Sequence, residues 1–268
     1  MPSVLITGAS RGLGYAFTQF YAAQPDNTVI ALVRNKSATE ARLAKDGITN
    51  VHVLSADITD ASAVQAAADE TAKITGGSLD ILINNAGLSG DDASAFLPLA
   101  DLTPAQIQEY FTASFQANVI GIAITTNAFL PLIRKGTTKK VITISTGMAD
   151  IDLVTQYDIA SSTSYAVSKI GTNMLVAKYH AALGKSEGIL FLAMSPGFVD
   201  TSEGKVPSKE QIEGIQAMAA KFANYAPDFK GPITPEESVR KVDEVVRRAT
   251  VESLGGAFVS HHGNKQWL

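Results

Sequence analysis

Cysteine is absent from this 268-residue sequence, tryptophan occurs once, and only 18% of the residues are charged. Without cysteine the chain can form no disulfide, thiolate nucleophile or cysteine-ligated zinc site. Acidic residues outnumber basic ones, 26 against 22, and no run of lysine or arginine occurs. A nucleic-acid partner, which requires a basic stripe against its phosphates, is therefore not expected. The four histidines are scattered and predict no metal site, and we interpret the adjacent His261 and His262 as a surface or interface feature.

Long apolar segments are also missing. The first residues lack the basic and apolar regions of a signal peptide, and no apolar stretch approaches the ~20 residues that cross a membrane. We therefore expect a cytoplasmic protein with no membrane partner. Hydrophobic residues nevertheless make up 46% of the chain, which is sufficient for a sizeable core and excludes general disorder.

Short apolar runs alternate with longer amphipathic stretches along the chain. The runs are almost unbroken in hydrophobicity, as in strands buried on both faces of a parallel sheet, and they lie at Val4–Thr7, Val29–Val33, Val51–Leu54, Ile81–Ile83, Val141–Ser145, Ile189–Met194 and Ala257–Val259. Helices are predicted at about Leu13–Ala23, Ala61–Thr75, Pro104–Arg134, Tyr165–Leu183 and Pro235–Arg248. This alternation predicts an α/β fold with a Rossmann-type, doubly wound parallel sheet of about seven strands and helices on both faces.

No linker or internal repeat divides the chain, so residues 1–268 are predicted to form a single domain. The main irregular zone, at about residues 197–233, contains three prolines and a helical patch near Ser208–Ala223. Loops of this length in a compact domain are often functional. We therefore interpret this zone as an excursion that covers the active site, and Ala149–Ser164 as a second insertion.

A glycine-rich loop follows the first predicted strand and leads into a helix; it reads Thr7-Gly8-Ala9-Ser10-Arg11-Gly12-Leu13-Gly14. Its glycines permit a tight turn and let backbone N–H groups approach a pyrophosphate, and the helix N-terminus adds partial positive charge. An ordinary glycine-rich turn is the alternative. The position directly after the first buried strand favours nucleotide binding.

Tyr165 and Lys169 are four residues apart near the start of a predicted helix, so their side chains share one face. A tyrosine loses its proton near pH ~10 in water. A neighbouring ammonium group, helped by a cationic nicotinamide, would lower that pKa and make the phenol an effective acid or base. Taken alone, the pair is better interpreted as a surface tyrosine and a solvated lysine.

The combination of motifs resembles the short-chain dehydrogenase/reductase family, in its single-domain branch, over nearly the whole chain. The glycine loop, Asn84-Asn85-Ala86-Gly87 after the fourth strand, and the Tyr165/Lys169 pair after the fifth occur in the family's order. The resemblance implies one dinucleotide-binding and catalytic domain. In it, Tyr165 and Lys169 are catalytic, and Asn118 holds a water that relays protons.

The same resemblance implies the residues that contact the cofactor. Asp57 would contact adenine, Asn85 to Gly87 would line the cofactor, and the segment after Pro196 would hold the carboxamide. The implied cofactor-binding residues are Gly8, Ser10, Arg11, Gly12, Leu13, Gly14, Arg34, Asp57, Ile58, Asn85, Ala86, Gly87, Tyr165, Lys169, Pro196, Gly197, Val199 and Thr201.

The chain departs from the family at the end of the fifth strand, where a serine normally binds the substrate oxygen. Aligning Val141 to Gly147 with that strand places Thr146 in the serine position, and a threonine keeps the hydroxyl donor. A shift of one residue would instead place Ser145 there. We favour Thr146 and retain Ser145 as the alternative.

The residues after the second strand favour NADP(H) as cofactor. An acidic residue at the end of that strand usually holds the ribose 2′-hydroxyl, but Val33 occupies this position and Arg34 follows it. Together with Arg11 in the glycine loop, Arg34 would suit a 2′-phosphate, because guanidinium groups form paired hydrogen bonds with phosphate. Two solvated surface arginines are the alternative.

The resemblance thus implies an enzyme that transfers hydride between NADP(H) and a small-molecule carbonyl or alcohol, with reduction of a ketone or aldehyde favoured. A non-enzymatic NADP-binding regulator of the same fold is the alternative, and an enoyl reductase or dehydratase is a second one.

A neutral, apolar substrate is suggested by the candidate pocket walls Leu88, Phe96, Met148, Ile151, Tyr157 and Phe198. The resemblance also implies a homo-oligomer, either a dimer or a tetramer. The specific substrate and the physiological direction are not defined by the sequence.

Overall fold

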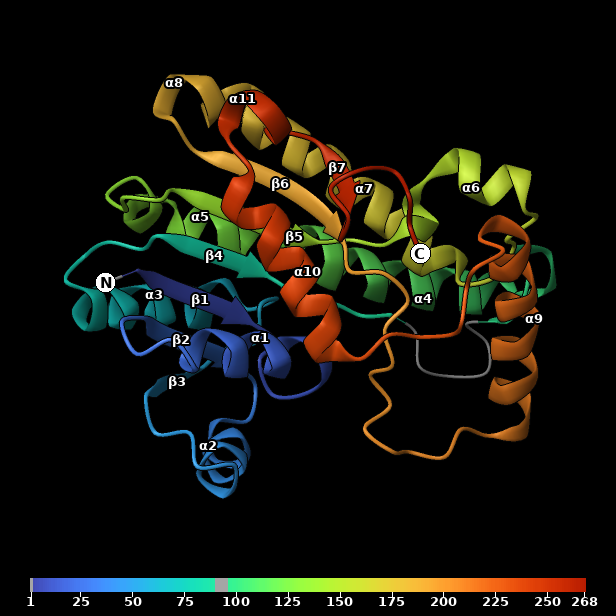
Figure 1. The fold of residues 1–268 in the computed structure, drawn as a ribbon, viewed down its shortest axis with the longest axis horizontal. Coiled ribbons are helices and arrows are strands. Elements are labelled where there is room, and N and C mark those ends of the chain that lie inside the picture. The colour runs from blue at the N-terminus through green and yellow to red at the C-terminus, as the bar shows by residue number, and fades with distance from the viewer. Residues whose placement is uncertain (1, 90–95) are drawn as a thin grey trace.

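In the computed structural model, which describes residues 2–89 and 96–268, seven parallel strands form one sheet in the order β3-β2-β1-β4-β5-β6-β7 (Figure 1). Their bounds are β1 (Ser3–Thr7), β2 (Thr28–Val33), β3 (Val51–Ser55), β4 (Ile81–Asn84), β5 (Lys140–Ile144), β6 (Leu190–Ser195) and β7 (Phe258–Ser260). The strand order reverses between β1 and β4, the point at which folds of this class form a ligand crevice. The predicted Rossmann-type sheet is confirmed.

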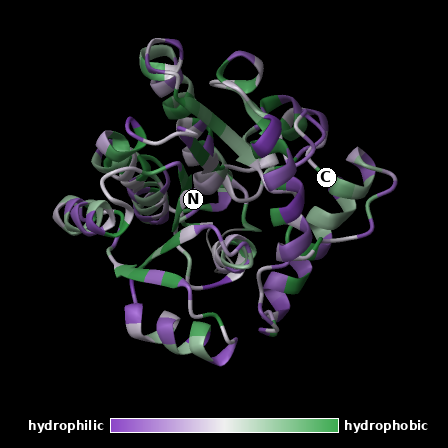
Figure 2. Ribbon diagram, turned by 60° about the vertical axis from the view of Figure 1, so that its left-hand side comes forward, coloured by the Kyte–Doolittle hydropathy of each residue, from purple (hydrophilic) through white to green (hydrophobic). Residues whose placement is uncertain are grey.

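Two separate cores cover the two faces of the sheet. Side chains alternate along each strand, so Val4 and Ile6 pack with α1 (Gly12–Ala22) and α10 (Pro235–Arg248), whereas Leu5 belongs to the core on the other face. The helices of that second face are α3 (Ala61–Thr75), α5 (Ile122–Ile133) and α7 (Thr163–Tyr179). Because both faces are covered, most strand positions are apolar, and the strands in the middle of the molecule are largely green in Figure 2.

The long predicted helix at residues 104–134 consists of α4 (Pro104–Phe115), a π-helical turn (Gln116–Gly121) and α5. By length and composition alone, Pro104–Ile133 is apolar enough to cross a membrane, so the expectation that no stretch approaches that length was wrong. Half of its most apolar window is buried inside the fold. α5 packs against α3 and β4, and α4 packs against α7, so these apolar side chains serve the core of the domain.

Two helices of more than one turn were not predicted. α2 (Lys36–Lys45) begins where the Asn35 side chain accepts the Ala38 N–H at 3.1 Å, and only Thr39 and Leu43 of this helix are buried. α6 (Ile151–Gln156) lies inside the predicted insertion and is capped by Asp150. Shorter helical segments are α8 (Lys185–Glu187) and α11 (Val251–Leu254).

A third apolar cluster lies beyond the carboxyl ends of the strands, where α6, α9 (Lys209–Tyr225) and the C-terminal residues gather (Figure 1). Its buried members are Met148, Leu153, Ile159, Phe222 and Trp267. α9 belongs to the predicted excursion and begins with a capping box between Ser208 and Gln211. The excursion leaves and returns at one place, because Val199 pairs in parallel with Ile233.

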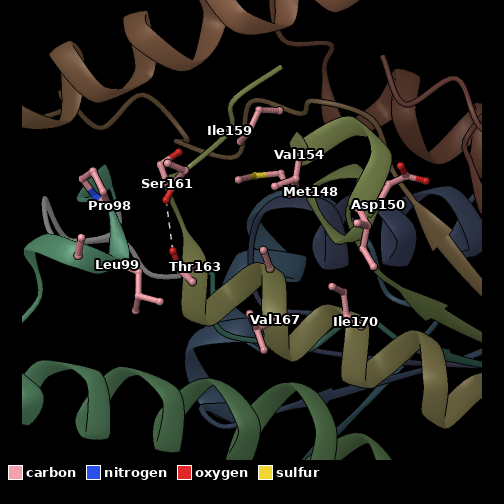
Figure 3. A pocket seen from close by; sticks show the side chains of 14 residues that line it. Pro98, Leu99, Met148, Asp150, Val154, Ile159, Ser161, Thr163, Val167 and Ile170 are labelled. Carbon is pink, nitrogen blue, oxygen red and sulfur yellow. Dashed lines mark hydrogen bonds between the residues drawn. The ribbon is translucent and has the colours of Figure 1, made fainter. Parts of the chain in front are cut away.

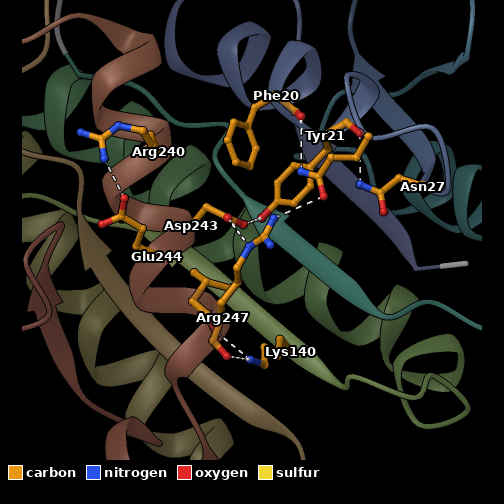
Figure 4. A network of polar contacts seen from close by, with 10 residues as sticks. Phe20, Tyr21, Asn27, Lys140, Arg240, Asp243, Glu244 and Arg247 are labelled. Carbon is orange, nitrogen blue, oxygen red and sulfur yellow. Dashed lines mark hydrogen bonds and ion pairs between the residues drawn. The ribbon is translucent and has the colours of Figure 1, made fainter.

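A buried polar network joins α1 to α10 (Figure 4). The Tyr21 hydroxyl donates to Asp243 at 2.9 Å, and Asp243 also accepts from Arg247. The ammonium of Lys140, at the start of β5, donates to the Val246 carbonyl oxygen at 2.6 Å. The network fixes α10 relative to α1 and the sheet, and α10 starts directly after the excursion.

Candidate active site

The loops after β1 and β4 meet at the carboxyl edge of the sheet. The Thr7 hydroxyl accepts the N–H groups of Asn85 at 3.0 Å and Ala86 at 2.9 Å, and the Asn85 side chain donates to the Thr7 carbonyl oxygen at 2.9 Å. A Cβ on Gly8 would lie 2.8 Å from the Ala86 Cα, and one on Gly14 would lie 2.2 Å from the Gly8 oxygen. The two predicted motifs therefore form one surface on which these two positions require glycine.

The start of α1 fits the phosphates of a dinucleotide. Gly12 opens the helix with a φ of 52°, and a Cβ there would lie 3.2 Å from the Thr201 Cβ. Arg11 is the exposed capping residue, and Leu13 is buried beneath the loop. Backbone N–H groups at a helix N-terminus bind anions well. These donors and the glycine-rich loop are the groups that would hold a pyrophosphate.

Arg34 and Asp57 lie at the ends of β2 and β3, as predicted. Arg34 is exposed directly after β2. The Asp57 carboxylate accepts the Thr59 N–H at 2.9 Å and the Thr59 hydroxyl at 2.7 Å; these bonds hold the pKa of Asp57 below its usual range, and the charge of Arg34 lowers it further. Ile58, the next residue, packs against Gly121. The structure thus gives Asp57 the role of a turn residue, and its contact with adenine stays a prediction.

Tyr165 and Lys169 come together on one face of α7. The Lys169 Nζ donates to the Ile144 carbonyl oxygen at 2.7 Å and lies 5.8 Å from the centre of the Tyr165 ring. Burial lowers the pKa of Lys169 to about 8. Burial also raises the pKa of Tyr165 to about 12, although the interaction with the Thr146 side chain lowers it. The protein's own groups therefore do not give the lowered tyrosine pKa expected from the sequence, because desolvation of the phenol dominates.

The two candidate hydroxyl donors differ in burial. Thr146 is half-buried, its hydroxyl interacts with the Tyr165 phenol, and it accepts the Met148 N–H at 3.3 Å. Ser145 is 1% exposed, and its Oγ has no hydrogen-bond partner within residues 2–89 and 96–268. Thr146 is therefore the more accessible of the two hydroxyl groups, and its contact with a substrate oxygen stays a prediction.

Asn118 is buried in the π-helical turn and ties the loop after β4 to α7. Its side chain accepts the Leu88 N–H at 2.8 Å and donates to the Leu88 carbonyl oxygen and to the Ser168 hydroxyl, both at 2.9 Å. A Cβ on Gly87 would lie 2.7 Å from the Asn118 Oδ1 and 3.4 Å from the Lys169 Nζ. Asn118 thus holds the backbone beside Lys169, and its proton-relay role stays a prediction.

The segment after β6 is supported from behind by the end of the chain. Gly197 has a φ of 87°, and a Cβ there would lie 2.8 Å from the His261 ring. Pro196 accepts a hydrogen bond from the Ser238 hydroxyl at 2.6 Å. His261 is 3% exposed, so its interpretation as a surface residue was wrong.

Two side chains were not found from the sequence. Both contact the glycine-rich loop at residues 7–14, which is called the phosphate loop from here on. Arg42 of α2 donates to the Ser10 carbonyl oxygen at 3.2 Å, and Glu203 of the excursion accepts the Gly12 N–H at 3.0 Å. Arg42 lies on a helix that the hydropathy pattern did not predict. Glu203 is 191 residues from Gly12 in sequence, and no local pattern indicates such a contact.

A mainly apolar cavity of about 450 Å³ lies between α6, the outer flank of α7 and residues 98–100 (Figure 3). Met148 and Ile151, two of the predicted pocket walls, line it together with Val154, Ile159, Val167 and Ile170. Tyr157 and Phe198 belong to the third apolar cluster, Phe96 packs beside Gly214 of α9, and Leu88 is exposed.

The described part of the chain has no cluster of side chains that would bind a metal.

Comparison with known proteins identifies the class. Residues 2–211 match the sequence model of the short chain dehydrogenase family. The short-chain dehydrogenase/reductase AacuF of Aspergillus aculeatus is 54% identical over 268 residues, and short chain dehydrogenase virK of Hypocrea virens is 46% identical over 272 residues; each match spans 100% of both chains. The NADPH-bound carbonyl reductase from chicken fatty liver has the same fold, with a TM-score of 0.77 at 24% identity and 98% of each chain covered. The chain therefore belongs to the short-chain dehydrogenase/reductase family of oxidoreductases.

Proposed function

We propose that this protein is an NADP(H)-dependent oxidoreductase that reduces the carbonyl group of a ketone or aldehyde. The observation that carries the proposal is the arrangement at the start of α7, where the half-buried Tyr165 phenol lies beside the Thr146 hydroxyl and the Lys169 Nζ is 5.8 Å from the centre of the Tyr165 ring. Bound nicotinamide would supply the hydride. The chain's own side chains would then have to supply a proton and stabilise the negative charge on the substrate oxygen.

Each of the three side chains suits one of these tasks. Tyr165, with a pKa of about 12, carries its proton at neutral pH and gives it to the substrate oxygen. The Thr146 hydroxyl donates a hydrogen bond to the same oxygen while charge develops there. The Lys169 ammonium favours the phenolate that is left behind, and Asn118 keeps the backbone around Lys169 in place.

Replacement of the phenol tests this assignment. Tyr165→Phe should lower turnover by at least about 100-fold, because the proton donor is removed, and should leave the Kd for NADPH within about twofold of that of the wild type. Tyr179→Phe is the matched control, since Tyr179 ends the same helix and its hydroxyl bonds Asn127 at 2.8 Å. Turnover retained in Tyr165→Phe would reject the scheme.

The preference for NADP(H) over NAD(H) is supported by the charge at the end of β2. Val33 occupies the position of the usual acidic residue, Arg34 follows it, and Arg11 lies in the phosphate loop. Arg34→Asp should weaken NADPH binding by roughly 10-fold to 100-fold, because it replaces a phosphate ligand with a repelling charge. NADH binding should change much less. Equal loss with both cofactors would contradict this choice.

A neutral, apolar carbonyl compound is the proposed substrate class. The cavity beside α7 is lined by Met148 and Ala166, which are close in sequence to Thr146 and Tyr165; Thr146 and Tyr165 themselves are not among its lining residues. Loss of nicotinamide absorbance with a panel of carbonyl compounds tests this class, and KM should fall as apolar size increases. Preference for small charged carbonyl compounds would contradict it. Tight NADPH binding with no turnover on the whole panel would favour the alternative of a non-enzymatic regulator.

Two further properties of the protein stay predictions, namely its homo-oligomeric state and its cytoplasmic location. Two exposed apolar side chains that do not line the cavity, Ile120 on the π-helical turn and Met174 on α7, support self-association through this part of the surface.

A further inference from the structure

A carboxylate from the excursion lies directly on the phosphate loop. The Glu203 Oε1 accepts the Gly12 N–H at 3.0 Å and accepts from the Arg42 Nη1 at 2.8 Å. Gly12 is the first residue of α1, so its N–H is one of the donors that the helix N-terminus offers to an anion. The protein itself thus supplies a negative group at this position.

Arg42 is held at the loop by contacts that do not involve Glu203. Its Nη1 donates to the Ser10 carbonyl oxygen at 3.2 Å, and its Cζ lies 3.8 Å from the centre of the Tyr15 ring. Tyr15 is 2% exposed, and its hydroxyl donates to Asp46 at 2.7 Å. A guanidinium stacked in this way is a fixed cation, so Arg42 stays beside the loop when Glu203 moves.

Glu203, in contrast, is held in a conformation that its backbone disfavours. Its φ is 52°, in the left-handed region, and Gly204 follows with a φ of 78°. A glutamate in this region is strained. The turn around it is closed by the Ser202 N–H, which donates to Asp200 at 2.9 Å, and by the Lys205 N–H, which donates to the Ser202 carbonyl oxygen at 3.1 Å. About a third of the Glu203 side chain is exposed. The bonds to Gly12 and Arg42 are therefore the contacts that hold the carboxylate in place.

We propose that Glu203 is a built-in competitor for the phosphate groups of the cofactor, and that Arg42 becomes a phosphate ligand when Glu203 leaves. The inference rests on the proposed dinucleotide function. Carboxylate and phosphate oxygens accept from the same backbone N–H and guanidinium donors, and two anions at one site repel each other. The free-energy cost of displacing Glu203 weakens cofactor binding, and the return of its carboxylate to the loop speeds cofactor release. Glu203 thereby sets the affinity of this site.

Charge removal at Glu203 is the direct test. Glu203→Gln keeps the side-chain size, and it should lower the Kd for NADPH by roughly threefold to tenfold in a fluorescence titration at low salt. The gain should shrink at high salt, because the charges are partly exposed. Glu213→Gln is the control for net charge, since Glu213 is exposed on α9 and only 4.0 Å from Lys209. Unchanged or weaker binding in Glu203→Gln, or an equal gain in the control, would overturn the proposal.

A double-mutant cycle tests the part assigned to Arg42. Arg42→Gln should weaken NADPH binding, and Glu203→Gln should give a smaller gain in that background, because the carboxylate acts partly through Arg42. Additive effects would overturn the role of Arg42. Titration with NADH separates the two kinds of phosphate: a gain with both cofactors identifies the pyrophosphate, and a gain with NADPH alone identifies the 2′-phosphate.

The failure of this inference is distinguishable from failure of the proposed function. Wild-type protein that binds neither NADPH nor NADH would reject the proposed function. Tight wild-type binding that is insensitive to Glu203→Gln would reject the competitor role alone.

Discussion

Lys169 is buried and the neighbouring Tyr165 is half-buried, and desolvation disfavours the charged form of each side chain. The pKa of the lysine falls to about 8, and that of the tyrosine rises to about 12. A neutral phenol next to an ammonium is the protonation state that a proton donor to a substrate oxygen requires. The resting charges therefore suit the reductive direction of the proposed reaction.

His261 is a second residue whose titration is set by burial. Burial, and then the charges of His262 and Lys241, lower its pKa from 6.5 to about 4, with Glu237 opposing. In the unfolded chain the imidazole titrates near 6.5. Between these two values the unfolded state binds a proton that the folded state does not, so the free energy of unfolding falls as the pH falls through this window.

Replacement of His261 should remove this acid sensitivity. Between about pH 7 and about pH 5, the wild type should lose about 2 kcal/mol more unfolding free energy than His261→Gln, measured by urea unfolding at each pH. His52→Gln, at an exposed histidine of β3, should keep the wild-type dependence. An unchanged pH dependence in His261→Gln would contradict the buried, neutral state of the imidazole.

At the scale of elements, the contact between α1 and α10 depends on one buried carboxylate. Asp243 is 5% exposed and accepts the hydroxyl of Tyr21, which is 3% exposed. One residue further along α10, Glu244 pairs with Arg240 at 2.7 Å on the solvent side. The two acidic side chains thus form similar bonds in very different surroundings.

Asp243→Ala should therefore lower the free energy of unfolding by about 2 kcal/mol, because it leaves the buried Tyr21 hydroxyl without its acceptor. Glu244→Ala should cost less than about 1 kcal/mol, as expected for an exposed pair. Chemical denaturation of the two variants gives the comparison. Equal losses would show that the buried bond contributes no more than the exposed pair.

Sequence reasoning recovered the strands and the buried helices because their apolar residues recur with a regular period. It missed α2, which has only two buried residues, Thr39 and Leu43, and therefore no apolar face to detect. The asparagine at position 35, which caps α2, was the available signal. Arg42 was missed for the same reason, and the buried place of His261 depends on a contact with Gly197 that is 64 positions away.

At the scale of the whole molecule, the end of the chain supports the loop that carries Thr146. Trp267 is 3% exposed and stacks on Phe258 with ring centres 4.5 Å apart. A Cβ on Gly147 would lie 2.7 Å from the Trp267 Cβ. The loop after β5 therefore packs directly on a residue that is 120 positions later in the sequence.

Trp267→Ala should lower the free energy of unfolding by about 3–5 kcal/mol, because it empties a packed position. In protein that is still folded, turnover should fall while NADPH binding changes little, since the phosphate loop lies elsewhere. Trp267→Phe, which keeps a ring against Phe258, should lose less of both stability and turnover. Loss of NADPH affinity parallel to the loss of turnover would contradict this separation.

The pairing of Val199 with Ile233 closes the excursion at its base. The Asp200 N–H donates to the Ile233 carbonyl oxygen at 3.0 Å, and the Ile233 N–H donates to the Phe198 carbonyl oxygen at 2.8 Å. A segment anchored in this way can vary in length and sequence between its two anchors. Insertions and deletions between the two anchors leave β6 and α10 in place. In the proposed enzyme, cofactor affinity can therefore diverge during evolution by changes in this one stretch of the gene, because Glu203 lies within it, without any change to the strands of the sheet.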